Sequence, residues 1–340
     1  MKYRVNGRAW ALGVAIAAGA GAGGGAILMG GCRAQGDVQE GAPPAGDGEV
    51  KHAPGSLAYD RSMWQQLLRD HASIRRVVRH TESGVEAVTE SEDPEVAARI
   101  RDHAHAMQER MKNGAQVRVW DEVFREMFEA HGKILIEVTD LPKGVMIKET
   151  SEDPGALALL RSHAMGVSAF VREGSAAAQG QTRRFRAGDA LPAPELAIGG
   201  VPHRFLLTQP DAGQVNGLRG DGVDVIVNFR KPVEHEGYDE AGVVNAAGAA
   251  YCNIPYKGAA ELTDSVIDAT REAIKAADER GETAALHCRT GNRIGPGWAA
   301  YRVLDQKIPL EQAVSEARAM QMTDVEMEKR VREYIAARGG

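Results

Sequence analysis

The stretch "LHCRTGNRIG", residues 286–295, decides how the second half of the chain is interpreted. It follows the apolar run "TAALHC" and precedes "GPGWAAYRVLDQ", which can form a helix. We therefore expect Cys288 at the end of a strand, residues 289–293 in a turn, and a helix that begins near Gly295. In such a turn, backbone N–H groups and the start of the helix converge and can hold an oxyanion.

The side chains of this turn suit a cysteine nucleophile. The field that holds an anion also favours the thiolate form of Cys288. Arg293 can clamp phosphate oxygens with its planar guanidinium, and Gly291 lets the backbone bend where a side chain would clash. Thr290 and Asn292 can hold the shape of the loop. The pattern indicates a nucleophile, an anion cradle and a counter-charge, and a buried thiol in a glycine-rich turn is the structural alternative.

The segments before this loop predict an α/β layer. "VDVIVNF" at 223–229 is a β-branched run, and "AAYCNIPY" and "TAALHC" are two further strand candidates. Between the last two, "ELTDSVIDATREAIKAADERGE" places Val266, Ile267 and Ile274 on one face of a helix. Strands that alternate with helices predict a parallel sheet flanked by helices, whose ligands bind at the carboxyl ends of the strands.

Residues 201–338 resemble the cysteine-dependent protein tyrosine phosphatase superfamily, specifically the bacterial phosphatase-like group found fused to or beside beta-lactamase-like hydrolases. The segments that carry the resemblance are "DGVDVIVNFR", "YCNIPYKGAAELT" and "HCRTGNRIGPGWAAYRVL". The resemblance implies that Cys288 is the nucleophile and that His287 tunes its thiolate, without a cofactor. The phosphate-binding residues are then those of the loop, which are Arg289, Thr290, Gly291, Asn292 and Arg293.

The chain departs from that family in two ways. Four residues separate Cys288 from Arg293, where tyrosine phosphatases usually carry five, and four is the spacing of rhodanese-like sulfurtransferases, whose cysteine carries a persulfide. The aspartate that serves as general acid in phosphatases has no clear counterpart. Glu261 and Asp264 are the candidates, and each is equally suited to the N-terminus of a helix. A site without a protein acid is a further alternative.

The first half of the chain repeats one pattern at an offset of 60 residues without a gap. Gly84 corresponds to Gly144, and "SEDP" occurs at 91–94 and again at 151–154. Each copy predicts a helix, two strands and a helix, so that two αββα units form an α+β domain with an antiparallel sheet. The expected boundaries are 56–174 for the domain, with repeats at about 56–114 and 116–174.

Four histidines occupy matched positions in the two repeats. His71 and His131 end the leading helices, and His103 and His163 lie on the trailing helices. They are weak candidates for a metal or haem site. The alternative is that each histidine caps a helix end or bonds across its hairpin, because the spacing of a typical ligand motif is absent.

The amino terminus predicts export. Basic residues precede the uncharged run "AWALGVAIAAGAGAGGGAILMG", and small residues lead to Cys32, which resembles a bacterial lipoprotein signal. Residues 1–32 are then a signal peptide, and lipidated Cys32 anchors a periplasmic or cell-surface protein to the membrane. An uncleaved anchor and ordinary signal cleavage are the alternatives. We expect flexible linkers at 33–55 and 175–200.

Composition excludes one class of partner. A net charge of −6 and an aromatic content of 5% argue against nucleic-acid binding. The expected function is therefore that of an exported phosphatase that hydrolyses a phosphate monoester through a phosphocysteine. The alternatives are a sulfurtransferase that uses the same cysteine and a non-catalytic module that binds an anion or a metal. Cys252 is expected to be a core thiol, or to form a regulatory disulfide with Cys288 if their strands are neighbours.

Overall fold

The computed structural model of the protein describes residues 55–235 and 237–339. The predicted signal peptide, Cys32 and nearly all of the linker at 33–55 lie outside these residues. Within the described part of the chain, no helix is both long enough and apolar enough to cross a membrane.

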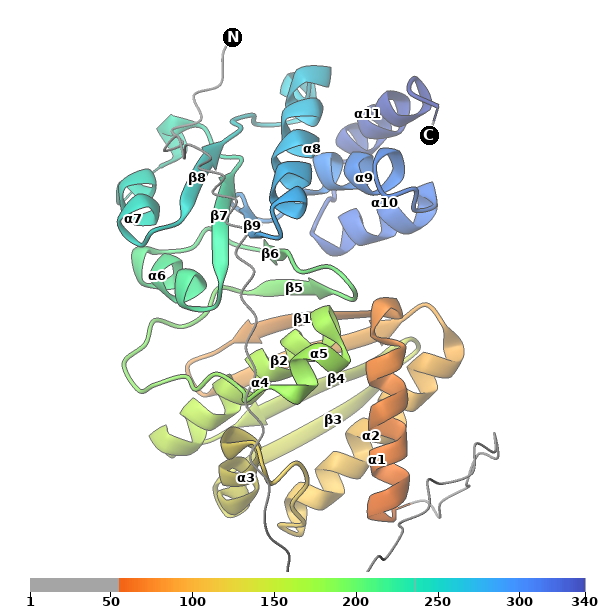
Figure 1. Ribbon diagram of the computed structural model, residues 1–340, viewed down its shortest axis with the longest axis vertical. Helices are drawn as coiled ribbons and strands as arrows, with labels where there is room; N and C mark the ends of the chain where they lie inside the picture. The colour runs from red at the N-terminus through yellow and green to blue at the C-terminus, as the bar shows by residue number, and fades with distance from the viewer. Residues whose placement is uncertain (1–54, 236, 340) are drawn as a thin grey trace, which may run out of the picture.

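All the described strands belong to one mixed sheet of nine strands in the order β3-β4-β2-β1-β5-β6-β9-β7-β8 (Figure 1). The pairs from β3 to β6 are antiparallel, and those from β6 through β9 and β7 to β8 are parallel. The strands are β1 (Ile74–His80), β2 (Gly84–Ser91), β3 (Leu135–Leu141), β4 (Gly144–Thr150), β5 (Glu195–Ile198), β6 (Arg204–Leu206), β7 (Val223–Asn228), β8 (Ala250–Asn253) and β9 (Thr283–His287).

The antiparallel part contains two segments with the same order of elements. The first has helix α1 (Leu57–Arg69), strands β1 and β2, and helix α2 (Pro94–Lys112); the second has α3 (Glu122–Glu129), β3, β4 and α4 (Pro154–Glu173). Asp93 and Asp153 cap helices α2 and α4, and a proline follows each cap. Figure 1 shows α1 to α4 gathered over the antiparallel strands, as in an αββα pair. That the two segments arose by duplication stays a prediction.

The segment 175–200 differs from the flexible linker that the sequence predicts. It contains a short helix, α5 (Ser175–Gln179), and strand β5, which pairs with β1 on one side and β6 on the other. Gly199 N–H donates to the carbonyl of Ile74 at 3.0 Å, and a Cβ on Gly199 would lie 1.7 Å from the carbonyl oxygen of His71. The two expected sheets are therefore one continuous sheet.

The parallel part has helices on both faces, as the sequence predicts. Val227 and Leu286 pack on the side of α8 (Asp264–Glu279), α9 (Gly295–Leu304), α10 (Leu310–Ala319) and α11 (Val325–Ala336). Ile226 and Ala285 pack on the opposite side, with α6 (Ala212–Gly220) and α7 (Glu240–Ala246). Successive side chains of a strand thus pack into hydrophobic cores on opposite faces of the sheet, which explains why these strands are apolar throughout.

A buried ion pair fixes α9, the helix that follows the cysteine loop. Arg302 on α9 donates to both carboxylate oxygens of Glu316 on α10, each at 2.8 Å, and Trp298 Nε1 donates to Glu316 at 2.8 Å. Both ions are almost fully buried. Such a pair is costly to break, because the surviving charge loses its partner inside the protein.

We expect Arg302→Leu to lower the free energy of unfolding by about 3–5 kcal/mol, because it leaves the Glu316 carboxylate buried with only the neutral donors Trp298 and Gln312. The double variant Arg302→Leu/Glu316→Leu should recover most of this loss, because no buried charge remains. Urea denaturation followed by circular dichroism measures both variants. A double variant as unstable as the single one would show that packing, and not charge, decides the cost.

Candidate active site

Cys288 lies directly after β9, at the carboxyl end of the parallel strands. Its side chain is buried, and its Sγ accepts the backbone N–H of Gly291 at 3.1 Å. Helix α9 begins at Gly295, so the intervening residues form a loop between a strand and a helix N-terminus. Arg289 and Thr290 are exposed at the tip of this loop. The loop folds over the sulfur, with at least one N–H directed at it.

The loop is pinned to the segment that follows α10. Gly291 has φ +87°, and a Cβ there would lie 2.2 Å from the carbonyl oxygen of Met320. The Asn292 side chain accepts the backbone N–H of Thr323 at 3.1 Å. Gly291 is required for both its backbone conformation and its close approach. Asn292 holds the shape of the loop through its amide oxygen, as the sequence suggests.

The Arg293 guanidinium is buried and oriented by several acceptors. It forms a two-pronged ion pair with Glu234 of the short helix η3 (Pro232–Glu234), with both N–O distances at 2.8 Å. Its Nη1 also donates to the carbonyls of Phe229 at 3.1 Å and Tyr256 at 2.8 Å. The hydrogen bond from Arg293 holds the pKa of Glu234 at about 2, so this carboxylate stays ionised.

The bonds to Arg293 leave one edge of the guanidinium unused. The acceptors described above engage Nη1 and one hydrogen of Nη2, and no acceptor for Nε occurs among the hydrogen bonds of the described residues. Burial acts to lower the pKa of Arg293, but its hydrogen bond to Glu234, the charge of Cys288 and a contact with the Cys288 sulfur raise it overall. The free edge, with Nε–H and one Nη2–H, is the geometry that binds two oxygens of one anion.

His287 is fully buried and faces a carboxylate rather than solvent. Its Nε2 lies 2.6 Å from Oε1 of buried Glu240 on α7, and Asn228 Nδ2 donates to the other oxygen of Glu240 at 2.7 Å. Because α7 packs on one face of the sheet and Cys288 belongs to the core on the other, the side chains of His287 and Cys288 lie on opposite faces of the sheet. That His287 tunes the thiolate stays a prediction.

The two candidate acids are already engaged by basic side chains. Glu261, on η4 (Ala259–Glu261), pairs with Lys231 at 2.6 Å, and Asp264 pairs with Arg338 at 3.0 Å and with Arg330. These hydrogen bonds lower the pKa of both carboxyl groups. A general acid must carry a proton before it donates one, so these ion pairs favour a structural role for both residues in this state of the protein.

Sequence analysis missed three residues near the loop, namely Glu234, Glu240 and Arg230. Arg230 is buried, and its Nε and Nη1 have no hydrogen-bond partner among the described residues. Glu234 and Arg230 follow β7, the strand beside β9, so the carboxyl end of "VDVIVNFR" was a signal that could have pointed to them. Glu240 lies on a later helix and carries no such signal.

A disulfide between Cys252 and Cys288 is ruled out in this fold. Cys252 lies on β8, Cys288 follows β9, and β7 lies between the two strands. Two strand spacings amount to about 9–10 Å, which exceeds the reach of a disulfide. Both cysteines are free, and Cys252 packs against the main core as a partly buried thiol.

The four histidines are not gathered into one site. His71 Nδ1 bonds the carbonyl of Val171 at 2.9 Å, and His131 Nδ1 bonds that of Phe128 at 3.0 Å, as expected for helix-end contacts. Among the residues that the structure describes, no group of three or more His, Cys, Asp and Glu side chains could hold a metal ion. His71, His103 and His163 line a cavity between the helices and the antiparallel strands.

No protein-family model matches the chain, and no curated protein matches it. Several solved structures resemble part of it. Tk-PTP in its active form has 17% identity and a TM-score of 0.34, covering 38% of this chain and 88% of its own. TpbA of P. aeruginosa has 21% identity and a TM-score of 0.34, covering 43% and 91%. A DUF442 protein of Shewanella putrefaciens CN-32 has 21% identity and a TM-score of 0.33, covering 38% and 82%. This likeness concerns part of the fold alone, so the chemistry of the loop must be argued from its own residues.

We expect Gly291→Ala to lower the free energy of unfolding by at least about 1–3 kcal/mol, because alanine is strained at positive φ and its Cβ meets a carbonyl. Gly258→Ala is the matched control, since that glycine is extended and has no atom within 4 Å of a Cβ position. Thermal unfolding compares the two. Equal stability of both variants would mean that the loop is not held against Met320.

Burial lowers the pKa of His103 from its ordinary 6.5 to about 4. The unfolded chain therefore binds a proton between these values while the folded chain does not, and stability falls as pH drops below 6.5. Lowering the pH from 8 to 5 should therefore lower the free energy of unfolding by about 2 kcal/mol through this histidine. His103→Leu should remove that part of the acid sensitivity, measured by urea unfolding at both pH values, whereas His105→Leu, at an exposed histidine of the same helix, should not.

Proposed function

We propose that this chain is a cysteine-dependent phosphatase that hydrolyses a phosphate monoester. The observation that carries the proposal is the pairing of Cys288 Sγ, which accepts the Gly291 N–H at 3.1 Å, with the oriented guanidinium of Arg293 at the other end of the loop. Nucleophile, N–H cradle and cation thus meet at the carboxyl end of β9. This is where an α/β sheet binds its ligands.

The reaction proceeds in two displacements. The Cys288 thiolate attacks phosphorus, the S–P bond forms as the P–O ester bond breaks, and the leaving oxygen takes a proton from water. A second water then attacks the phosphocysteine, which releases inorganic phosphate and restores the thiolate. In both steps the loop N–H groups and the free edge of Arg293 stabilise the charge on the phosphoryl oxygens. Glu234 holds Arg293 in this orientation before the substrate arrives.

The cellular setting is part of the proposal and rests on the sequence alone. Residues 1–32 would direct export, and Cys32 would carry a lipid that attaches the protein to the outside of a membrane. The substrate would then be a phosphorylated molecule met outside the cytoplasm.

A sulfurtransferase is the second candidate, because four residues and not five separate Cys288 from Arg293. A shorter loop makes a tighter cradle around the sulfur. In that reaction Cys288 would accept a sulfane sulfur from thiosulfate and pass it to cyanide, giving thiocyanate.

The test assays the full-length protein with p-nitrophenyl phosphate and, separately, with thiosulfate and cyanide. Cys288→Ser should lower phosphate release by about 10³-fold or more, because the nucleophile is lost. Cys252→Ser is the matched control at the other described cysteine and should stay within about twofold of the parent, since its thiol lies two strands away.

Three other outcomes would contradict the phosphatase. Thiocyanate formation without phosphate release would assign the loop to sulfur transfer. Phosphate release that survives Cys288→Ser would locate the activity elsewhere. Absence of both activities in a folded protein would leave the loop as an anion-binding site.

A further inference from the structure

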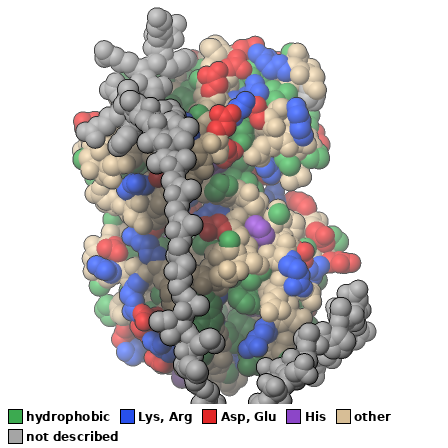
Figure 2. All heavy atoms as spheres, in the orientation of Figure 1, with side chains coloured by type: hydrophobic (Ala, Val, Ile, Leu, Met, Phe, Trp, Pro, Cys, Tyr) green, Lys and Arg blue, Asp and Glu red, His purple; other side chains and the backbone are tan. Residues whose placement is uncertain are grey.

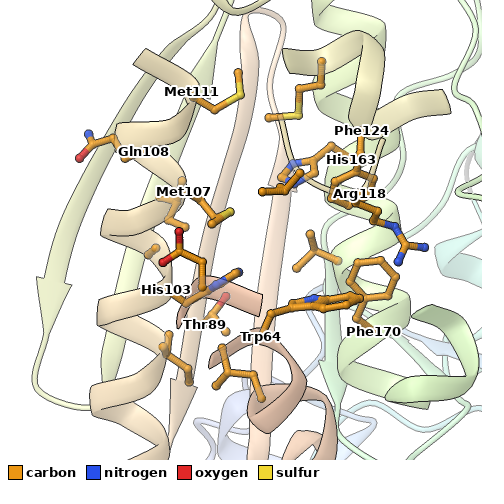
Figure 3. Close-up of a pocket in the computed structure, with 18 of the residues that line it drawn as sticks. Trp64, Thr89, His103, Met107, Gln108, Met111, Arg118, Phe124, His163 and Phe170 are labelled. Carbon is orange, nitrogen blue, oxygen red and sulfur yellow. The ribbon is translucent and has the colours of Figure 1, made fainter. Parts of the chain in front are cut away.

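We propose that the antiparallel part of the protein binds an uncharged, largely apolar organic molecule that carries a hydroxyl group. The site is an internal cavity of about 600 Å³ between helices α1 to α4 and the strands beneath them (Figure 3). It lies apart from Cys288 and is independent of the proposed phosphatase activity.

The walls of the cavity are mainly apolar, aromatic and thioether groups. Trp64 from α1, Met107 and Met111 from α2, Phe124 from α3 and Phe170 from α4 converge on it in Figure 3. Protein interiors are close-packed, with few voids larger than a water molecule, so a space of this size is not a packing defect. Its volume falls in the range of about 300–1,000 Å³ that is typical of small-molecule sites.

Four buried polar atoms on residues that line the cavity lack a hydrogen-bond partner among the described residues, namely Asp60 Oδ1, Arg76 Nε and the Nδ1 atoms of His103 and His163. His163 Nδ1 lies 3.5 Å from Glu149 Oε1. An unsatisfied buried polar atom costs about 1–3 kcal/mol. A hydroxyl group can donate to one imidazole nitrogen and accept from another, so it satisfies both histidines when one of them carries its proton on Nδ1.

Most charged side chains around the cavity lie beside an opposite charge. Asp60 pairs with Arg110 at 2.6 Å, and Arg118 pairs with Asp121 at 3.2 Å. Arg76, on the floor of the cavity, donates to Thr89 at 2.7 Å and faces the buried carboxylate of Glu149. Arg61, which has no ion pair among the described residues, is exposed to solvent. An ionic ligand inside the cavity would therefore be buried beside cations that are already paired, which is costly. This arrangement favours an uncharged molecule.

The cavity has an apolar rim at the surface. Leu57, Val119 and Trp120 line the cavity, yet they are 46%, 51% and 48% exposed. Figure 2 shows hydrophobic side chains at the surface in the lower half of the molecule, where these helices lie. Arg118 holds the rim loop in place, because its Nη atoms donate to the carbonyls of Ala178 and Gly180 at 2.7 and 2.9 Å. Exposed apolar residues at the mouth of a cavity suit the entry of an apolar ligand.

The first experiment titrates the full-length protein with N-phenylnaphthylamine, an uncharged dye whose fluorescence rises in apolar surroundings. We expect saturable binding at one site. The double variant Met107→Trp/Val167→Trp fills the cavity from two facing helices and should abolish that signal. Met146→Trp, at an exposed methionine outside the cavity, should bind like the parent and is the matched control.

Charge selectivity is tested with anilinonaphthalene sulfonate, which has the same rings and one added sulfonate. We expect it to bind at least about 10-fold more weakly, because the buried cations of the cavity already face carboxylates and do not offset the cost of burying a sulfonate. Equal binding of the two dyes, or binding that survives the filled cavity, would overturn the proposal. If the filled variant does not fold, the double variant Trp64→Phe/Trp120→Phe supplies the same test, because these two tryptophans line the cavity and their loss should remove most of the energy transfer from the protein to the dye.

The hydroxyl group is tested by competition between the dye and decanol or decanoate. Decanol should displace the dye and decanoate should not. His103→Leu should weaken the binding of decanol by about 2- to 10-fold more than it weakens the binding of the dye, which is the value of one hydrogen bond. If His103→Leu alters decanol affinity no more than dye affinity, His103 does not recognise the ligand, and this part of the proposal is wrong.

Discussion

The pairing of β1 with β5 and of β5 with β6 is the constraint on which the rest of the structure depends. These contacts turn an antiparallel αββα pair and a parallel α/β layer into one sheet. Glu195 on β5 is buried at this junction, 3.6 Å from both Arg172 and Arg204. Burial acts to raise its pKa, but the surrounding guanidinium groups lower the pKa overall. The junction is therefore held by buried charge as well as by backbone hydrogen bonds.

The sheet holds the residues of the candidate active site in fixed positions. Cys288 follows a strand with a neighbour on each side, and its loop enters a helix tied to α10 by a buried ion pair. Arg293 is oriented by Glu234 from the turn after the neighbouring strand. Strand, turn and helix each fix one component of the site, and this preorganisation is what transfer of a charged group requires.

Much of the cysteine loop could be predicted from sequence, because its elements are long and strongly patterned. The strand at 223–229 and the helix near Gly295 agree with β7 and α9 within one residue. Strands β5 and β6 have only four and three residues, too few to show a period, so the junction of the two halves was missed. Glu234 and Glu240 were missed because only the fold brings them to Arg293 and His287. The cavity of the antiparallel part could not be predicted, because no sequence pattern indicates where packed helices and strands leave a space.

Strand β1 faces two different interiors. Arg76 points into the cavity of the antiparallel part, whereas its neighbour Val77 packs against the core that surrounds Cys288. A protein whose halves share a wall in this way cannot be cut into modules, because separation would expose an apolar strand edge that invites aggregation. A fragment that ends between the two halves is therefore expected to be less stable than the whole chain.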